Sequence, residues 1–204
     1  MKTIVFATGN KDKVVEIREI LSGAEILPMS EIGFDSEIEE DGQTFRDNAL
    51  IKASAVADYI RREKPEYAEA LVLADDSGLE IDAMDKMPGV QSHRWLGERS
   101  YTEAMEDIIR DMDAVPEEKR SARFVCAIAA CLPDGRKLTV QETVEGRVAR
   151  EIRGKEGFGY DPFFYVPEFG CTTAEMTREQ KNAISHRGKA LRAMRDLLTR
   201  EGIL

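Results

Sequence analysis

Hydrophobic residues change their spacing several times along the first part of the chain, and each change predicts a new element. Lys2 to Ala7 is a largely apolar run rich in β-branched residues, which predicts a buried strand. Thr8-Gly9-Asn10 breaks this run. From Lys11 to Ser22 the apolar residues recur at helical spacing, and Gly23 follows as a helix stop. A short strand near Glu25 to Met29 would complete a strand–helix–strand unit, which is usually parallel and right-handed.

A second helix is predicted from Thr44 to Arg62. Its apolar residues share one face: Phe45, Ala49, Ala53, Val56 and Ile60. At 100° per residue, Lys52 falls only about 20° outside that apolar stripe. A lysine beside a face that packs on the core is expected to have an anionic partner.

The remaining pattern predicts more strands and a few helices. Ala70 to Ala74 predicts a buried strand that Asp75-Asp76-Ser77-Gly78 ends, and Leu79 to Ala83 then alternates apolar and polar residues. A helix is expected from Thr102 to Met112. The segments 123–132 and 137–144 form a hairpin by composition and spacing. Thr177-x-x-Gln180 resembles a capping box. Together these elements predict a mixed α/β domain spanning residues 1–204, with two lobes and a cleft between them.

Composition and charge narrow the class of protein. The 204 residues are 42% hydrophobic, enough for a sizeable core, and the net charge is 29 − 39 = −10. This acidic balance counts against a broad nucleic-acid-binding face. No apolar run approaches the roughly 18 residues of a membrane span. The odd count of three cysteines, with no zinc-type cluster, predicts a reduced, cytoplasmic protein.

Two segments carry candidate chemistry in the first half of the chain. Thr8 to Lys13 lies where a strand gives way to a helix, so its N–H groups and two lysines could hold phosphate, although an ordinary turn explains them equally well. Asp75-Asp76-Ser77-Gly78 follows a buried strand, where a carboxylate could bind Mg²⁺ or activate a water molecule. The alternative is that the segment is only a turn built from Asp and Gly. Because strand residues alternate in direction, one aspartate is expected to face a cleft and the other to accept turn amides. The acidic stretch Asp35 to Asp41 supplies a second metal ligand or is a solvated loop.

Two further segments follow in the second half. The segment Gly157 to Pro162 contains two aromatic residues among glycines, so one ring could stack on a flat ligand. The alternative is that both rings belong to the core beside a glycine turn. Lys181 to Arg187 offers cationic donors at a helix start for phosphate or for a base carbonyl, or is a surface cap. Each signal is modest, but together they form the parts of a Mg²⁺-dependent nucleotide site.

At this point five ordered motifs resemble one known family. They are Thr8-Gly9-Asn10-x-x-Lys13, Ala74-Asp75-Asp76-Ser77-Gly78-Leu79, Pro88-Gly89-Val90, Phe158-Gly159-Tyr160-Asp161-Pro162 and Lys181-Asn182-Ala183-Ile184-Ser185-His186-Arg187. In this order they resemble the inosine triphosphate pyrophosphatase family, and in particular its bacterial dITP/XTP pyrophosphatase branch. The similarity runs from Lys2 to the last helix.

The resemblance implies a homodimeric enzyme with an elongated mixed β-sheet, flanked by helices, and a nucleotide cleft between two lobes. It implies that Asp76 is the acid–base residue and a Mg²⁺ ligand, joined by Glu39, although Glu40 fits the pattern equally well. The residues implied to bind substrate are Thr8, Gly9, Asn10, Lys11, Asp12, Lys13, Lys52, Ser77, Phe158, Gly159, Tyr160, Asp161, Lys181, His186 and Arg187.

The activity implied is hydrolysis of ITP, dITP and XTP to the monophosphate and pyrophosphate, which removes deaminated purines from the nucleotide pool. Two alternatives remain at this stage. An NTP-using transferase would need a second substrate pocket, for which no segment is left over. A non-catalytic nucleotide-binding protein would not need Asp76.

Overall fold

The computed structural model describes residues 2–204, apart from the side chains of residues 11 and 12. The chain folds into two compact units. Unit 1 comprises residues 1–76, 126–142 and 187–204, and unit 2 comprises residues 77–125 and 143–186.

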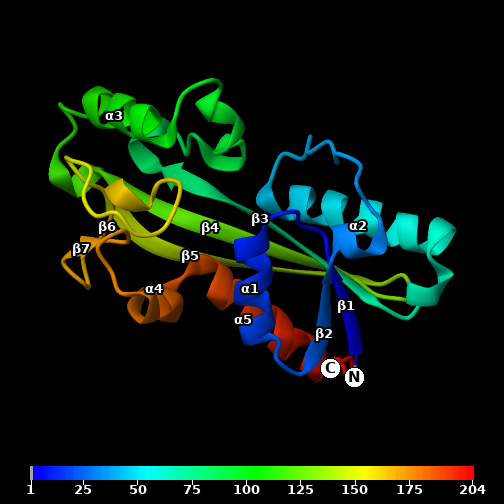
Figure 1. Cartoon of the computed structure of the whole chain (residues 1–204). Helices are drawn as coiled ribbons and strands as arrows, with labels where there is room; N and C mark the ends of the chain where they lie inside the picture. Colours follow the sequence, from blue (N-terminus) through cyan, green and yellow to red (C-terminus); the bar gives the residue numbers. More distant parts are fainter. Residues whose placement is uncertain (1) are drawn as a thin grey trace. The chain divides into compact units, whose positions relative to one another are not determined.

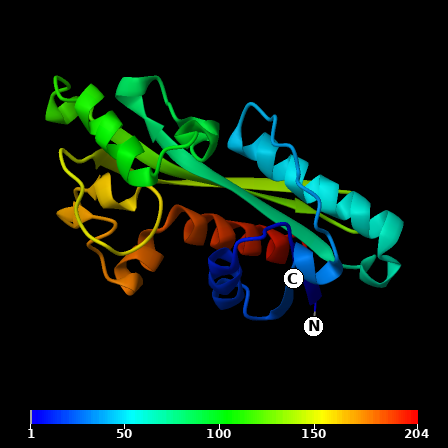
Figure 2. The same cartoon turned by 45° about the horizontal axis from the view of Figure 1, so that its top comes forward.

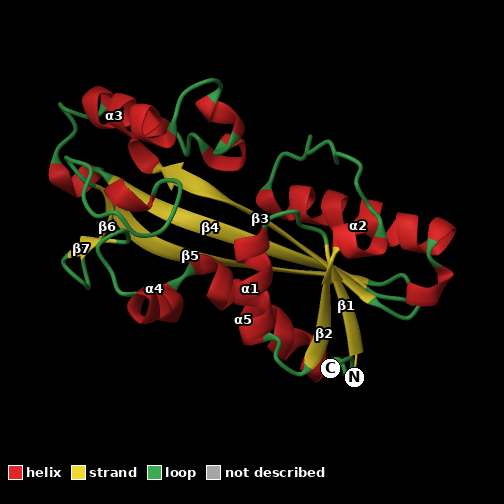
Figure 3. Ribbon diagram, viewed as in Figure 1, coloured by secondary structure: helices red, strands yellow, loops and turns green. Residues whose placement is uncertain are grey.

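Within the described residues, seven strands form one mixed sheet of order β2-β1-β3-β4-β5-β6-β7 (Figure 3). The strands are β1 (Lys2–Phe6), β2 (Ala24–Pro28), β3 (Leu71–Ile81), β4 (Ser121–Cys131), β5 (Lys137–Val148), β6 (Phe164–Val166) and β7 (Cys171–Thr172). β1 pairs in parallel with both β2 and β3, whereas β6 is antiparallel to β5 and β7. The predicted mixed α/β class is confirmed, and so is the parallel pairing of the first two strands, β1 and β2, on either side of the first helix.

The α-helices and the shorter 3₁₀ turns connect these strands (Figure 1). The α-helices are α1 (Lys11–Ile20), α2 (Phe45–Glu63), α3 (Tyr101–Asp111), α4 (Arg178–Ile184) and α5 (His186–Arg200). The 3₁₀ turns are Met29–Ile32, Pro65–Tyr67, Asp82–Met84, Gly89–Gln91, Arg94–Leu96, Glu117–Lys119 and Asp161–Phe163. None of the helices in residues 2–204 combines the length and apolar character needed to cross a bilayer.

In unit 1, helices cover both faces of the strands, with α2 on one side of β1 and α1 and α5 on the other (Figure 2). One core cluster joins α1 and α5 to alternate strand residues, among them Ile4, Phe6, Leu71 and Leu73. The intervening residues, such as Val72, are equally buried and face α2. Burial on both faces explains why these strands are almost continuously apolar.

In unit 2, the apolar face of α3 packs on the parts of β3, β4 and β5 that belong to this unit, which are residues 77–81, 121–125 and 143–148. Ala104, Met105 and Ile108 from α3 share one cluster with Leu79 and Ile81 from β3. Ser100 and Glu103 form a capping box that begins α3, and Thr177 and Gln180 form the predicted one that begins α4.

One boundary was predicted wrongly. β3 does not end at Asp75 but continues through Ser77-Gly78 to Ile81. Leu79 and Ile81 are fully buried in the unit 2 core, so the strand continues through its polar middle to a second hydrophobic cluster. The aspartates therefore lie within a strand rather than in a turn.

Arg120 is completely buried in unit 2 and donates to three backbone carbonyls. Its guanidinium reaches the carbonyl oxygens of Met112, Val148 and Ala149, which joins the end of α3 to the end of β5. The side chain therefore satisfies acceptors that have no regular partner where these elements end.

We expect Arg120→Met to lower the free energy of unfolding by about 3 kcal/mol, because each buried carbonyl left unsatisfied costs roughly 1–3 kcal/mol. Urea unfolding followed by circular dichroism measures this change. Arg150→Met is the matched control, since Arg150 also donates to carbonyls but at the exposed surface, and should change stability by less than about 0.5 kcal/mol. Equal losses in the two variants would contradict the role given to Arg120.

Candidate functional site

Asp75 and Asp76 point to opposite faces of β3, and each meets a different set of helices. Asp75 continues the face of Leu71 and Leu73, which packs against α1 and α5. Asp76 lies on the other face, toward α2, where it contacts Asn48. The alternation predicted for this pair is therefore confirmed, and it separates two charge clusters within unit 1.

The first cluster is a buried row of alternating charges centred on Asp75, which is 1% exposed. Lys13 Nζ lies 2.9 Å from its carboxylate, and the Nε of Arg187 lies 3.3 Å away. Arg187 in turn pairs with Glu16 of α1 at 3.0 Å. Burial alone would raise the pKa of Asp75, but the Lys13 and Arg187 cations outweigh it and hold that pKa well below its usual range.

This cluster corrects one expectation and leaves another open. One of the two aspartates was expected to accept the amides of a turn, but both lie within β3, where Asp75 accepts from Lys13 and Arg187. Arg187 is itself buried between two carboxylates, so its charge supports Asp75. Its direct contact with a substrate base stays a prediction.

The second cluster holds Asp76 from α2. Asn48 Nδ2 donates to Asp76 Oδ2 at 3.1 Å, and Lys52 Nζ lies 3.4 Å from Asp76 Oδ1. Burial, together with the nearby Glu40 and Asp75 carboxylates, raises the pKa of Asp76, and Lys52 and the Asn48 amide offset only part of this rise. For Lys52, burial would lower the pKa, but Asp76 and Asp75 raise it above its usual value, so this side chain keeps its proton. The predicted anion beside the apolar stripe is thus present.

The acidic loop reaches this cluster through Glu40. Lys52 Nζ lies 2.8 Å from Glu40 Oε2, so one ammonium joins Glu40 to Asp76. Among the described residues, Glu39 is exposed and forms no hydrogen bond or ion pair with Lys52 or Asp76. Of the two glutamates, the structure therefore brings Glu40 rather than Glu39 next to Asp76.

Asn48 is a site residue that the motifs did not reveal. It is fully buried, and its Oδ1 accepts the Gly42 N–H at 2.9 Å while its Nδ2 faces Asp76. Because an N–H can only be met by an acceptor, this contact fixes which way the amide points. A signal existed, since Asn48 lies one helical turn before Lys52 and therefore on the same side of α2.

The predicted phosphate-binding segment caps α1. Thr8 Oγ1 accepts the Asn10 N–H, and Asn10 Oδ1 accepts the Lys13 N–H, so the segment turns tightly into the helix. Adding a Cβ to Gly9 would meet nothing within 4 Å. The side chains of Lys11 and Asp12 lie outside the described part of the chain. Lys13 is thus the cation of this segment that the structure pairs with Asp75.

In unit 2, the predicted aromatic segment presents Phe158, whose side chain is 58% exposed. Asp161 is buried and accepts from the Phe158 N–H at 2.8 Å, from Thr173 Oγ1 and from Lys181 Nζ. Lys181 Nζ also lies 5.3 Å from the centre of the Phe158 ring. Asp161 therefore holds both the exposed ring and the lysine in place.

Other predicted residues of this unit are less accessible. Tyr160 is buried, packs edge-on against Tyr101 and donates its hydroxyl to the Ser92 carbonyl, so its ring belongs to the core. His186 is half-buried and stacks on Phe124 with ring centres 5.1 Å apart. Ser77 follows Asp76 on β3 and is also half-buried.

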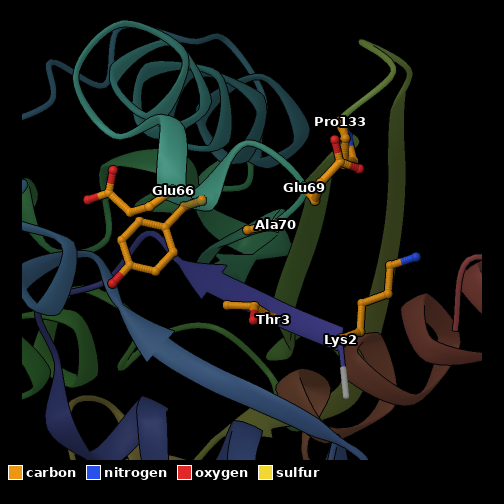
Figure 4. A pocket seen from close by; sticks show the side chains of 7 residues that line it. Lys2, Thr3, Glu66, Glu69, Ala70 and Pro133 are labelled. Carbon is orange, nitrogen blue, oxygen red and sulfur yellow. The ribbon is translucent and has the colours of Figure 1, made fainter.

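A separate hollow of about 300 Å³ lies in unit 1 beside the start of β1 (Figure 4). Its lining is mixed in charge and consists of Lys2, Thr3, Glu66, Tyr67, Glu69, Ala70 and Pro133. None of these is a predicted site residue. The predicted site residues therefore lie outside this hollow.

Known proteins match the chain along nearly its whole length. A model of the Ham1 family matches residues 4–197. The dITP/XTP pyrophosphatase of Desulforamulus reducens is 46% identical over 200 residues, which cover 97% of this chain and 96% of that protein. The Bacillus subtilis dITP/XTP pyrophosphatase is 44% identical over 201 residues, with 97% and 98% covered. The chain belongs to the Ham1 family.

Solved Ham1 structures share the fold. The Staphylococcus aureus Ham1 protein superposes with a TM-score of 0.87 at 36% identity, covering 98% of this chain and all of that one. A HAM1 protein from Coxiella burnetii gives 0.86 at 40% identity over the same shares. The resemblance inferred from the five sequence motifs is thus confirmed at the level of family and fold.

We expect Asp75→Asn to lower the free energy of unfolding of this Ham1-family chain by on the order of 3–5 kcal/mol at pH 7, because it leaves buried cations without their shared anion. The pKa of Asp75 is lowered on folding, so its contribution is complete above the unfolded pKa of about 3.9 and is lost as pH falls below that value. The difference between wild type and variant should therefore shrink between pH 5 and pH 3 in urea unfolding.

Asp58→Asn serves as the control for this prediction. Asp58 pairs with Arg61 at the exposed surface, where an ion pair contributes at most about 1 kcal/mol. If Asp75→Asn were no more destabilising than Asp58→Asn, the buried charge row would not support the fold.

Proposed function

We propose that this chain hydrolyses dITP, XTP and ITP to the nucleoside monophosphate and pyrophosphate. The chain is a hydrolase that acts on phosphoric anhydrides. Its relatives in the Ham1 family carry the name dITP/XTP pyrophosphatase, which describes such an enzyme. The observation that carries the proposal is the half-buried Asp76 carboxylate, which contacts Asn48 and Lys52. The preceding residue of the same strand, Asp75, holds Lys13 by an ion pair. This arrangement combines a proton acceptor with cations for phosphate.

The donor set fits Mg²⁺. Glu40 Oε2 and Asp76 Oδ1 both contact the same Lys52 Nζ, at 2.8 and 3.4 Å, so one cation already bridges them. Two carboxylates completed by phosphate oxygens and water are a usual Mg²⁺ environment. We therefore assign Glu40, rather than Glu39, as the partner of Asp76. When bound, Mg²⁺ neutralises charge on the triphosphate and on the departing pyrophosphate.

Asp76 accepts a proton from the water that attacks the α-phosphorus. Its raised pKa makes the carboxylate a stronger base than that of an ordinary aspartate. The Asn48 amide fixes the rotation of the carboxylate through Oδ2. Asn48 thereby orients Oδ1 for the reaction without itself touching the substrate.

The cations and the start of α1 bind the triphosphate. Lys13 and Lys52 donate to phosphate oxygens, and the N–H groups at the start of α1 favour negative charge. Thr8, Gly9 and Asn10 shape that start, and Gly9 leaves room for close approach. These contacts carry no information about the base.

The base is recognised by the unit 2 residues. Phe158 offers an exposed ring for stacking, while Lys181 and His186 supply donors to a 6-keto oxygen. Asp161 and Tyr160 do not contact the base in this proposal. Their hydrogen bonds hold the segment that carries Phe158 in position. We further propose that residues 1–204 work as one catalytic domain of a homodimer, in the cytoplasm where the nucleotide pool is used.

We expect Asp76→Asn to keep the melting temperature within a few degrees and to lower kcat by at least about 100-fold, since it removes the proton acceptor. Pyrophosphate release from ITP with excess Mg²⁺ measures the loss. Asp58→Asn, at the exposed surface, should leave kcat unchanged. An Asp76→Asn protein as active as wild type would exclude Asp76 as the base.

We expect kcat/KM for ITP, dITP and XTP to exceed that for GTP and ATP. Adenine sets an amino donor against the donors of the protein, and such a mismatch can reach about 10⁴-fold discrimination. Guanine shares the 6-keto group, so its rejection depends on its 2-amino group. The 2′-hydroxyl should matter little. Cleavage of ATP as fast as ITP would refute this pocket while leaving the pyrophosphohydrolase chemistry intact.

A further inference from the structure

Lys52 binds the same carboxylate oxygens that a metal ion needs. Its Nζ lies 2.8 Å from Glu40 Oε2 and 3.4 Å from Asp76 Oδ1, and the side chain is 14% exposed. The positively charged ammonium therefore bridges the two acidic oxygens.

An ammonium and a divalent cation cannot occupy this point together. Mg²⁺ bonds its oxygen ligands at about 2.0–2.1 Å, so it would lie within a few ångströms of Nζ if Lys52 kept both contacts. Like charges at such a separation repel strongly where water is largely excluded. Binding of a metal at Glu40 and Asp76 thus requires Lys52 to leave.

We propose that Lys52 is a built-in counter-ion of the metal site, which releases Glu40 and Asp76 when a triphosphate offers its ammonium other oxygens. This inference rests on the proposed function, because it takes the metal site and the triphosphate from there. It adds that metal and nucleotide bind with positive coupling, transmitted by one side chain.

The surroundings of Lys52 permit this exchange without refolding. The apolar stripe of α2 is buried, so the helix stays in place while the flexible four-carbon stem of the lysine swings. Asn48 holds Asp76 through Oδ2, whereas Lys52 holds Oδ1. Departure of Lys52 therefore frees one oxygen of a carboxylate whose orientation is still fixed.

The coupling has a consequence for the protein without nucleotide. Lys52 neutralises one of the two carboxylate charges and so weakens metal binding when no triphosphate is present. Coupling between two ligands is reciprocal, so metal strengthens triphosphate binding by the same factor. Removing the ammonium should abolish the competition and make the nucleotide-free protein bind metal more tightly.

The test measures binding of Mn²⁺ to the nucleotide-free protein by electron paramagnetic resonance of the free ion. We expect Lys52→Met to bind Mn²⁺ between roughly 5- and 150-fold more tightly than wild type, the usual range of coupling between sites. Lys52→Arg keeps the charge and should bind as weakly as wild type. The gain must depend on Glu40, so the double variant Lys52→Met/Glu40→Gln should lose it.

Isothermal titration with the non-hydrolysable α,β-imido analogue of ITP, with and without Mg²⁺, completes the test. We expect Mg²⁺ to strengthen binding of the analogue more in wild type than in Lys52→Met. Unchanged Mn²⁺ affinity in Lys52→Met, while wild type shows a Mg²⁺ effect on the analogue, would overturn the counter-ion role alone. If neither protein showed any metal dependence, the proposed metal site itself would be wrong, and this inference with it.

Discussion

The ion pairs of Asp75 are the interaction on which unit 1 depends. A carboxylate that is 1% exposed can stay ionised only if nearby cations replace its lost hydration, and these come from α1 and α5. Lys13, Asp75 and Arg187 are far apart in the sequence, so the row closes only when strand and both helices are in place. Satisfying one buried charge thereby fixes the position of Lys13, the cation proposed to bind the triphosphate.

The alternation of side chains along β3 places Asp75, which stabilises the fold, and Asp76, the proposed base, on opposite faces of the strand. Residues on one face of the strand pack with α1 and α5 and end at Asp75, while those on the other face meet α2 and end at Asp76. A slip of one residue in the pairing of β3 with β1 would exchange the two aspartates. The apolar residues that precede the pair set this register, so hydrophobic packing decides which carboxylate contacts Asn48 and Lys52.

The Phe158 segment of unit 2 is built differently, around a glycine and a buried acid. Gly157 has φ +81°, and a Cβ there would meet the Asp161 carboxylate and come within 2.7 Å of Lys181 Nζ. Only glycine therefore allows Asp161 to reach both the Phe158 N–H and Lys181. These contacts keep the Phe158 ring at the surface, where the proposed function uses it for stacking.

The sequence by itself determined the local elements, the mixed α/β class, the family and the odd position of Lys52, because apolar periodicity, glycine stops and ordered motifs are local properties of the chain. It did not determine the length of β3, because the polar centre of the strand resembles a break between two apolar stretches. The partners of Asp75, the contact of Lys52 with Glu40 and the position of Asn48 beside Asp76 were decided only by tertiary structure. Each depends on distances between segments remote in sequence, and no periodicity within one segment reports which charge another segment will place beside it.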